Sequence, residues 1–425
     1  RQTREPLMAT SAIHVFAHWS GMDAPQHMGE LRVARSRGKE VFVFSYDQVW
    51  LKGGGRFALD PALRLFTGPQ YVQEDQPNFG LFLDTAPDRW GRMLMQRREA
   101  LIARKQQRPV RALAESDYLL GVHDRSRMGA LRFKLDEQGA FLADDSDKPI
   151  PPMARLRELE AACLAIETGA GRDQEKWLNL LLAPGSSLGG ARPKASVIDP
   201  SGALWIAKFP SRSDDLDKGA WEWVTHQLAV RCGIFTAPAR AQRFNGPGHT
   251  FLTERFDRTP QGERIHFASA MTMLQRADGD DAHAGASYLE IAEFLMRHGA
   301  HTGRDLEQLW KRIVFNIRVR NTDDHLRNHG FLLGAKGWEL SPAYDMNPEP
   351  QGTGLSLNID AHSNALSMEL ALDVAPYFRV PHRKAKATIT AVNKWVEASW
   401  MPLAKKAGIG RVAIEEMKAV FSGAD

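Results

Sequence analysis

The segment between Gly185 and Asp257 constrains the fold most strongly, because strand and helix patterns alternate there over a short length. Two β-prone runs are separated by Asp-Pro-Ser-Gly at residues 199–202, a combination typical of a tight turn. A helical run follows and ends before Gly233, where a glycine commonly caps a helix. A third β-prone run comes next. The strands, the helix and the last strand are predicted at residues 193–198, 203–209, 217–232 and 251–256.

The two halves of the chain carry different patterns. The first half reads as short strands and turns with a charged helix, whereas the second half is mainly helical and contains one hairpin. Further strands are predicted at 41–44 and 129–135, helices at 88–104, 153–167 and 305–320, and the hairpin at 330–344. In the last helical region, Ile389, Val392, Trp395 and Val396 are expected to form one apolar stripe. A β-rich half followed by a helical half predicts an α+β fold with two lobes.

A polar, proline-rich stretch at residues 144–152 reads as a linker between domains. The length of 425 residues suits two or three domains. We expect a β-rich N-terminal subdomain at residues 1–150, a small lobe at 151–262 and a helical large lobe at 263–425.

The composition excludes only a few classes of protein. Hydrophobic residues make up 43% and charged residues 25% of the chain, as in ordinary soluble globular proteins. No apolar run approaches the roughly 20 residues of a membrane-spanning helix, so no membrane association is expected. The two cysteines, Cys163 and Cys232, are too few for a disulfide framework and suit a reducing cytoplasm. A net charge of +4 is only weak support for a nucleic-acid partner.

The strongest chemical signal is the polar run Asn321-Thr-Asp-Asp-His-Leu-Arg-Asn328. Asp345 follows Asn328 by 17 residues, and the predicted hairpin lies between them. Phosphoryl transfer needs one carboxylate beside the attacking hydroxyl and oxygen ligands that hold Mg²⁺ on the phosphates. Protein kinases place these groups with this spacing. Asp323 is therefore the candidate catalytic base, and Asn328 and Asp345 are the candidate Mg²⁺ ligands.

Two other interpretations of this run remain open. Aspartate, asparagine and histidine are common at helix ends, so the run can also be an ordinary solvated loop. Alternatively, Asp323, Asp324, His325 and His329 could ligate zinc or iron, although no clear carboxylate–histidine pair elsewhere supports that site.

A second group of signals lies upstream. Residues 186–194 form a loop of small residues that enters a strand, and glycines in such loops let backbone N–H groups approach phosphates. The loop lacks the Gly-Lys-Ser/Thr ending of a Walker motif, which argues against a P-loop NTPase. Lys208 stands in an otherwise apolar strand, where a lysine needs an anionic partner, and Glu222 follows in the predicted helix. Each feature alone also fits a turn, a surface lysine or a solvated glutamate.

The order of these features is more specific than any one of them. A glycine-rich loop, a strand lysine, a helix glutamate and a hinge strand precede the catalytic aspartate and the two metal ligands, as in protein kinases. This order predicts a two-lobed, protein-kinase-like fold that binds ATP and Mg²⁺.

Several motifs can be compared together, namely residues 187–194, Lys208, 254–258, 321–328 and 342–345. In this combination they resemble the HipA family of serine/threonine kinases, and residues 46–51 and 82–88 resemble the N-terminal subdomain of that family more loosely. The glycine-rich loop reads Gly-Gly-Ala-Arg-Pro-Lys, where the best-known toxin of the family has Ala-Gly-Ala-Gln-Glu-Lys. This departure concerns the substrate more than the kinase activity.

The resemblance implies roles for individual residues. Lys208 would contact the nucleotide phosphates, Glu254 to Phe256 would form the hinge against adenine, and His325 to Asn328 would line the nucleotide. The full set predicted to bind the nucleotide is Ser187, Leu188, Gly189, Gly190, Ala191, Arg192, Lys194, Lys208, Glu222, Glu254, Phe256, His325, Arg327 and Asn328.

The resemblance also implies a substrate and partners. Family members act on translation, with a glutamyl-tRNA synthetase as the known case, and many pair with a small DNA-binding antitoxin. We therefore expect a protein substrate such as an aminoacyl-tRNA synthetase, an antitoxin partner, and contact with DNA only through that antitoxin. Family members are also phosphorylated on a serine of the glycine-rich loop, which corresponds to Ser187, with Ser186 as the adjacent alternative.

Two other functions remain to be separated from this one. A degenerate kinase fold could act only by binding an antitoxin or DNA, but it would have no need to keep Lys208, Asp323, Asn328 and Asp345. A small-molecule kinase of the aminoglycoside type shares the same chemistry and differs at the acceptor site.

Overall fold

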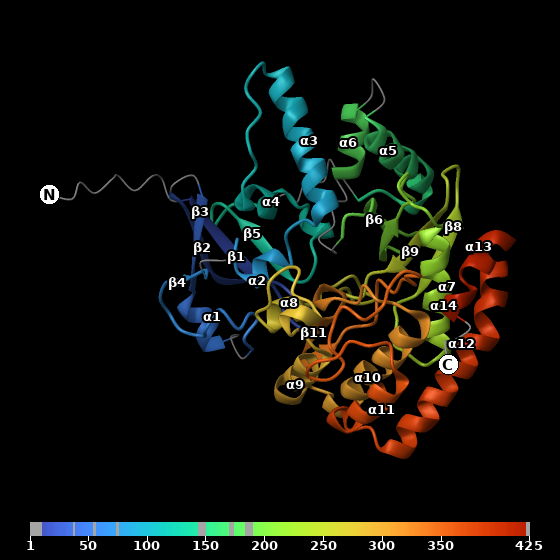
Figure 1. Ribbon diagram of the computed structural model, residues 1–425. Helices are drawn as coiled ribbons and strands as arrows, with labels where there is room; N and C mark the ends of the chain where they lie inside the picture. The colour runs from blue at the N-terminus through green and yellow to red at the C-terminus, as the bar shows by residue number, and fades with distance from the viewer. Residues whose placement is uncertain are drawn as a thin grey trace.

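The computed structural model describes residues 11–36, 39–53, 57–73, 76–142, 150–169, 174–182 and 190–421. Within these ranges the chain forms three separate β-sheets, and its helices gather mainly in the C-terminal half (Figure 1). The α+β prediction is therefore confirmed. Most of the predicted linker at 144–152 lies outside the described residues, as do Ser186, Ser187, Leu188 and Gly189.

The first sheet is antiparallel, with five strands in the order β4-β3-β2-β1-β5. Its strands are β1 (Ser11–Ala17), β2 (Gln26–Ser36), β3 (Lys39–Tyr46), β4 (Gln70–Tyr71) and β5 (Leu131–Lys134). The helices between β3 and β5 are α1 (Gln48–Gly53), α2 (Gly80–Leu83), α3 (Arg89–Lys105) and α4 (Glu115–Gly121). The alternating residues Ile13 and Val15 face the core. Val15 pairs with Phe133, so β5 lies next to β1 at the edge of the sheet.

Helix α3 connects this region to the rest of the protein. It begins after Asp88, whose carboxylate accepts the backbone N–H of Gly91 and caps the helix. Trp90 and Leu94 of α3 belong to the same apolar cluster as α5 (Leu156–Thr168) and α6 (Gln174–Leu182), and Figure 1 shows α3 beside α6. The apolar core thus crosses the boundary expected near residue 150, and the division into domains stays a prediction.

The second sheet is also antiparallel and has the order β6-β7-β9-β8. Its strands are β6 (Lys194–Ile198), β7 (Leu204–Lys208), β8 (Ala239–Arg243) and β9 (His249–Glu254), and α7 (Lys218–Arg231) packs against it. Strand β8 was not predicted. It reads Ala-Arg-Ala-Gln-Arg and lies at the sheet edge, so it carries no apolar alternation that a sequence pattern could reveal.

The third sheet, in the order β10-β11-β12, lies among the helices of the C-terminal half. Its strands are β10 (Phe267–Ser269), β11 (Gly330–Gly334) and β12 (Gly337–Leu340), which include the predicted hairpin. The helices are α8 (Ala270–Met273), α9 (Tyr288–His298), α10 (Thr302–Val319), α11 (Met368–Val374), α12 (His382–Lys406), α13 (Arg411–Glu416) and α14 (Lys418–Phe421). Helix α10 begins three residues before the predicted start at Asp305, and Arg320 caps its C-terminus.

The apolar stripe predicted for the last long helix is partly wrong. In α12, Val392 and Val396 are buried and Trp400 continues the same face, whereas Trp395 is 47% exposed. Steps of four residues stay on one face of a helix, but adjacent residues such as Trp395 and Val396 point about 100° apart. The core side of α12 therefore follows the four-residue steps and excludes Trp395.

Helix α7 begins very close to the backbone of β9. A Cβ atom added at Gly219 would lie 2.0 Å from the carbonyl oxygen of His249, so the helix or the strand would have to move. We expect Gly219→Ala to lower the free energy of unfolding by about 1–3 kcal/mol in a denaturant titration. Gly303→Ala, where a Cβ meets nothing within 4 Å, is the control and should be neutral or slightly stabilising. An unchanged stability of Gly219→Ala would contradict this close approach.

Buried ion pairs join the N-terminal region to the chain that follows β9. Asp257, which is fully buried, lies 2.6 Å from the guanidinium of Arg255 and 2.5 Å from that of Arg258. Its carboxylate also accepts the backbone N–H of Gly129 at 2.9 Å, and Arg255 donates to the carbonyl of Ser126 at 2.6 Å. These bonds fix residues 126–129 against the segment that follows β9.

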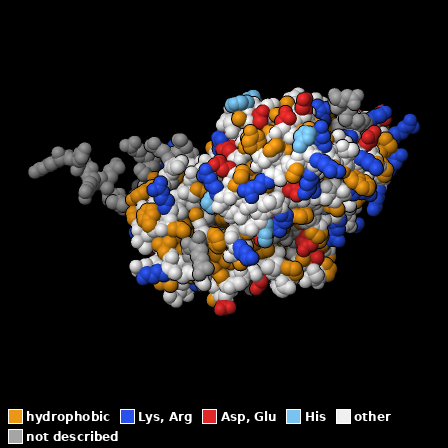
Figure 2. Space-filling model, turned by 90° about the horizontal axis from the view of Figure 1, so that it is seen from below, with side chains coloured by type: hydrophobic (Ala, Val, Ile, Leu, Met, Phe, Trp, Pro, Cys, Tyr) orange, Lys and Arg blue, Asp and Glu red, His pale blue; other side chains and the backbone are white. Residues whose placement is uncertain are grey.

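Figure 2 shows one face of the protein, on which lysine and arginine side chains are interspersed with acidic and hydrophobic ones. Across the described ranges, no helix has both the length and the apolar character required to cross a bilayer.

Candidate active site

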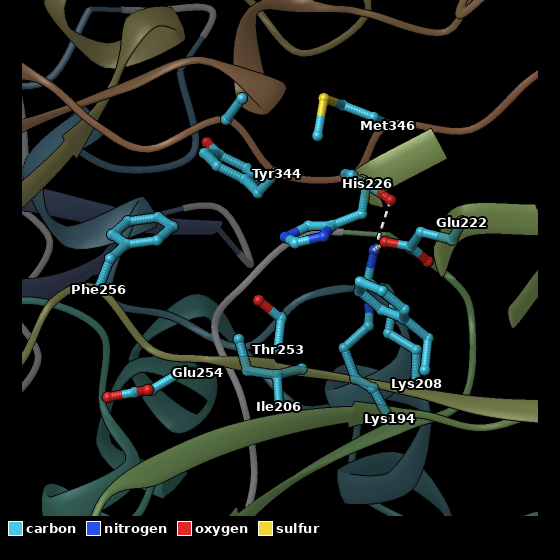
Figure 3. Close-up of a pocket in the computed structure, with 13 residues that line it drawn as sticks. Lys194, Ile206, Lys208, Glu222, His226, Thr253, Glu254, Phe256, Tyr344 and Met346 are labelled. Carbon is cyan, nitrogen blue, oxygen red and sulfur yellow. Dashed lines mark hydrogen bonds and ion pairs between the residues drawn. The ribbon is translucent and has the colours of Figure 1, made fainter. Parts of the chain in front are cut away.

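Two neighbouring cavities are lined by the second sheet, α7 and the chain around Asp345. The inner cavity, of about 600 Å³ including space open to solvent, is lined by Lys194, Ile206, Lys208, Glu222, His226, Phe251, Thr253, Glu254, Phe256, Ala343, Tyr344, Asp345 and Met346 (Figure 3). The outer cavity, of about 1070 Å³ on the same measure, is lined by Glu167, Gly190, Ala191, Arg192, Pro193, Lys194, Lys208, Ser211, Ser213, Asp214, Lys218, Glu222, Asn321, Asp323, Asp345, Asn347 and Glu349. Lys194, Lys208, Glu222 and Asp345 line both, so they mark the junction between the two cavities.

Lys208 stands at the centre of this junction. It is the last residue of β7, and its Nζ lies 2.6 Å from Oε1 of Glu222 and 2.5 Å from Oδ1 of Asp345. Glu222 is placed by α7, which begins after Asp217 because that carboxylate accepts the N–H of Ala220. Lys208 therefore has the anionic partners that its position in an apolar strand requires.

Burial and charge act in opposite directions on these three groups. Burial would raise the pKa of Asp345, but the Lys208 ammonium prevails and holds the pKa of this carboxyl well below its usual range. Burial and the charge of Asp345 raise the pKa of Glu222, and Lys208 offsets this only in part. Burial would lower the pKa of Lys208, whereas the carboxylates raise it above its ordinary value. Lys208 therefore stays protonated, and Asp345 stays ionised and able to bind a cation.

The loop that carries Asp323 begins where α10 ends. The backbone φ of Arg320 is 52°, a left-handed conformation that turns the chain out of the helix. A short 3₁₀ turn, Leu326–Asn328, follows the loop. Asp323 lines the outer cavity and remains exposed to solvent. Partial burial raises the pKa of its carboxyl, His325 opposes this effect, and the charge of Asp345 adds to it.

Asp324 and His329 are buried and line neither cavity. Asp324 is 3% exposed, and its Oδ2 accepts hydrogen bonds of 2.7 Å each from the Tyr288 hydroxyl, the Asn316 amide and Nε2 of His329. Throughout the described part of the chain, no group of three or more His, Cys, Asp or Glu residues is arranged to hold a metal ion. Asp323, Asp324, His325 and His329 therefore do not form the zinc or iron site that was one interpretation of this run.

Asn328 and Asp345 carry oxygen atoms that suit Mg²⁺. Nδ2 of Asn328 donates to the backbone carbonyl of Asp323 at 2.9 Å, and its Oδ1 accepts no hydrogen bond from the described residues. Both hydrogen bonds to the Asp345 carboxylate, from Lys208 and Asn347, use Oδ1, and within the same residues Oδ2 accepts none. Carboxylate and amide oxygens are the ligands that Mg²⁺ prefers. Asn328 itself lies beside the cavities rather than in their lining.

The predicted hinge borders the inner cavity. Glu254 ends β9, and the backbone N–H groups of Glu254 and Arg255 donate to the carbonyls of Pro238 and Leu204. The N–H of Phe256 has no acceptor among the described residues, so it is available to a bound molecule. The centroids of the Phe256 and Tyr344 rings lie 5.4 Å apart, and these two rings form one wall of the cavity (Figure 3).

Ion pairs tie down the described end of the glycine-rich loop. Gly190 has a φ of 91°, a conformation that favours glycine. Lys194 pairs with Asp88 at 2.8 Å, and both side chains are 2% exposed, so β6 is joined to the start of α3. Arg192 pairs with Asp214 at 2.8 Å in the outer cavity.

Most of the predicted site residues meet at the two cavities, but three do not line them. Asn328 and His325 lie close by, and the charge of His325 acts on the carboxyls of Asp323 and Asp345. Arg327 pairs with Asp278 at 3.1 Å and lines neither cavity, so a nucleotide contact by its side chain stays a prediction. The contacts predicted for Ser187, Leu188 and Gly189 fall outside the described residues and stay predictions.

Some cavity residues were missed from the sequence. Met346 and Asn347 directly follow Asp345, so a wider window around that carboxylate would have included them. His226 lies four residues after Glu222 in α7, and helical periodicity places both on the same side. Phe251 offers no signal of its own, because an aromatic residue in a strand is ordinary core.

Comparisons with known proteins agree with this geometry. Residues 186–400 match the family described as HipA-like C-terminal domain. The "Putative kinase Y4mE" of Sinorhizobium fredii is 24% identical over 394 residues, which cover 86% of this chain and 81% of that protein. A "Putative kinase" of Haemophilus influenzae is 29% identical over 110 residues, which cover 24% of this chain and 32% of that protein.

A solved structure shares the fold over nearly the whole chain. It is a chain of the complex of HipA, HipB and operator DNA from the toxin–antitoxin system of Shewanella oneidensis MR-1. The TM-score is 0.66 at 16% sequence identity, and the match covers 96% of each chain. The fold is thus the α+β, kinase-like fold of that protein. Because the family match spans about half of the 425 residues and includes Lys208, Asp323 and Asp345, this chain belongs to the HipA family.

Proposed function

We propose that this protein is a kinase that uses ATP and Mg²⁺ to phosphorylate serine or threonine side chains of a protein. The observation that carries the proposal is the position of Lys208, between Glu222 and Asp345 at the junction of the two cavities. The apolar inner cavity suits adenine beside Phe256, and phosphates that extend past Lys208 would enter the outer cavity, where Asp323 lies.

The proposed reaction uses few groups. The acceptor hydroxyl oxygen bonds to the terminal phosphorus of ATP, the bond to ADP breaks, and Asp323 takes the hydroxyl proton. Asn328 and Asp345 would hold Mg²⁺, which neutralises charge on the phosphate oxygens. The loop serines Ser187 and Ser186 would be acceptors in autophosphorylation.

The relatives suggest partners. The Shewanella oneidensis protein is named in a complex with HipB and operator DNA, and on this basis we propose a small DNA-binding antitoxin as partner, with DNA contacted through it. From the family resemblance we propose a translation protein such as an aminoacyl-tRNA synthetase as substrate. The two free cysteines and this substrate class favour the cytoplasm.

Nucleotide binding with and without Mg²⁺ tests this proposal. In calorimetry, Mg²⁺ should tighten the binding of ATP to the wild type, and Asp345→Ala should lose most of this gain, about tenfold, because one of two metal ligands is removed. Asp136→Ala, at an exposed turn, is the control. Absence of ATP binding by the wild type would refute the proposed function, whereas wild-type binding that Mg²⁺ does not change would refute the magnesium roles of Asn328 and Asp345.

A further inference from the structure

A chain of hydrogen-bonded asparagines connects Asp324 to Asp345. Oδ2 of Asp324 accepts from Nδ2 of Asn316 at 2.7 Å, and Oδ1 of Asn316 accepts from Nδ2 of Asn321 at 3.0 Å. Oδ1 of Asn321 accepts the backbone N–H of Asn347 at 3.1 Å, and Nδ2 of Asn347 donates to Oδ1 of Asp345 at 3.0 Å. We call Asn316, Asn321 and Asn347 the asparagine chain. None of these three residues has a role in the reaction proposed above.

Burial makes the asparagine chain directional. Asn316 is 2% exposed, and Asn321, which borders the outer cavity, is 1% exposed, so little water reaches their amides to replace these partners. An amide oxygen can only accept and an amide nitrogen can only donate. Turning the Asn321 amide over would therefore break its bonds to Asn316 and Asn347 together, which holds the chain in one orientation.

The asparagine chain also lies beside two unusual backbone conformations. Arg320 and Asp345 have φ values of 52° and 57°, in the left-handed region that residues with a Cβ rarely adopt. Such conformations persist only when the surrounding structure holds them. Asn321 follows Arg320 and binds the N–H of Asn347, and Glu349 donates its N–H to the carbonyl of Arg320 at 2.9 Å. These bonds hold the two left-handed positions next to each other.

The result is a fixed orientation of the Asp345 carboxylate. Lys208 and Asn347 both bind Oδ1, so the carboxylate cannot rotate without losing one of them, and Oδ2 remains without a hydrogen bond from the described residues. Asn347 lines the outer cavity, so it acts at the site itself. We propose that Asn347, held by Asn321, is a positioning residue that orients the Asp345 carboxylate for Mg²⁺, and that the asparagine chain couples this orientation to the loop that carries Asp323. This inference rests on the proposed ATP and Mg²⁺ binding.

The test separates positioning from general damage to the site. ATP affinity is measured by calorimetry in excess EDTA and again over a series of Mg²⁺ concentrations, for the wild type and for Asn347→Ala. We expect Asn347→Ala to keep the Mg²⁺-free affinity and to need roughly tenfold more Mg²⁺ for the same tightening, because a hydrogen bond to a charged group is lost. Asn364→Ala is the control. It removes one side-chain hydrogen bond, from Nδ2 of Asn364 to the carbonyl of Leu355, outside the site, and should behave as the wild type.

Three outcomes would overturn the inference. An unchanged Mg²⁺ requirement in Asn347→Ala would refute the positioning role, and an equal loss of affinity with and without Mg²⁺ would assign Asn347 to the nucleotide site in general. If Asn321→Ala folds, as judged by its thermal unfolding, it should share the higher Mg²⁺ requirement, and the double variant should lose no more than Asn347→Ala alone. Additive losses would refute the coupling. A wild type that binds no ATP would instead refute the proposed function.

Discussion

Asp323→Asn is expected to lower the rate of phosphate transfer by about 10²–10⁴-fold while the protein stays folded, since this is the range in which a general base contributes. An amide in this position cannot take the proton of the acceptor hydroxyl. It is nearly isosteric, and the side chain faces the outer cavity, so packing should not change. ATP binding should persist, because Lys208 and Asp345 are untouched.

The measurement uses the protein as its own substrate. Mass spectrometry after incubation with ATP and Mg²⁺ should find phosphate on Ser187 or Ser186 in the wild type and almost none in Asp323→Asn. Asp136→Asn is the matched control at an exposed turn and should be phosphorylated like the wild type. A rate close to that of the wild type in Asp323→Asn would remove Asp323 from the reaction.

The pH dependence of the wild type should report the same group. A general base works only when it is ionised, and partial burial together with the charge of Asp345 raises the pKa of Asp323 above its ordinary value of 3.8. Activity is therefore expected to fall as the pH drops through this raised pKa, and the loss should occur at a higher pH than for an aspartate with an ordinary pKa. The pKa of Asp345 is lowered, so its ionisation is complete over that range and does not produce the loss.

Asp257→Ala is expected to lower the free energy of unfolding by about 3–5 kcal/mol, the usual cost of breaking a buried ion pair. The removal leaves the buried guanidinium groups of Arg255 and Arg258 without their carboxylate, and the N–H of Gly129 without its acceptor. Because these bonds also fix residues 126–129, the contact between the N-terminal region and the chain after β9 should weaken first.

Denaturant titration measures this change, and an exposed pair supplies the control. Glu293 and Arg297 form an ion pair on the surface of α9, so Glu293→Ala should change stability by no more than about 1 kcal/mol. The arginines hold the pKa of Asp257 below its ordinary value. Its stabilising contribution is therefore present above the unfolded pKa near 3.8 and is lost only as the pH falls through the lower folded value. A small effect of Asp257→Ala at neutral pH would show that these ion pairs contribute little.

Local sequence patterns predicted the elements that carry the site. Apolar residues between Leu306 and Ile317 recur at helical spacing, and α10 forms over this segment. Turn residues between two β-prone runs predicted β6 and β7, and with them the position of Lys208 at the end of a strand. These signals are readable because strand and helix periodicity and turn chemistry are properties of neighbouring residues.

Other features depended on contacts between distant residues. Strand β8 is polar and exists because β9 offers it a partner. Lys194 pairs with Asp88, 106 residues away, a contact that no local pattern indicates. Trp395 faces solvent because the core lies along the four-residue steps of α12.

The chemical groups of the site can be identified from the order of residues alone: a strand lysine, a helix glutamate and the spaced set of Asp323, Asn328 and Asp345. Their contacts and orientations depend on the folded chain. It brings Lys208 between two carboxylates from separate elements, turns Asp324 into the interior while its neighbour Asp323 faces the cavity, and links the two loops through the asparagine chain. Spacing along the chain specifies which groups are present, whereas hydrogen-bond partners and burial, which decide charge and orientation, arise only when distant segments pack together.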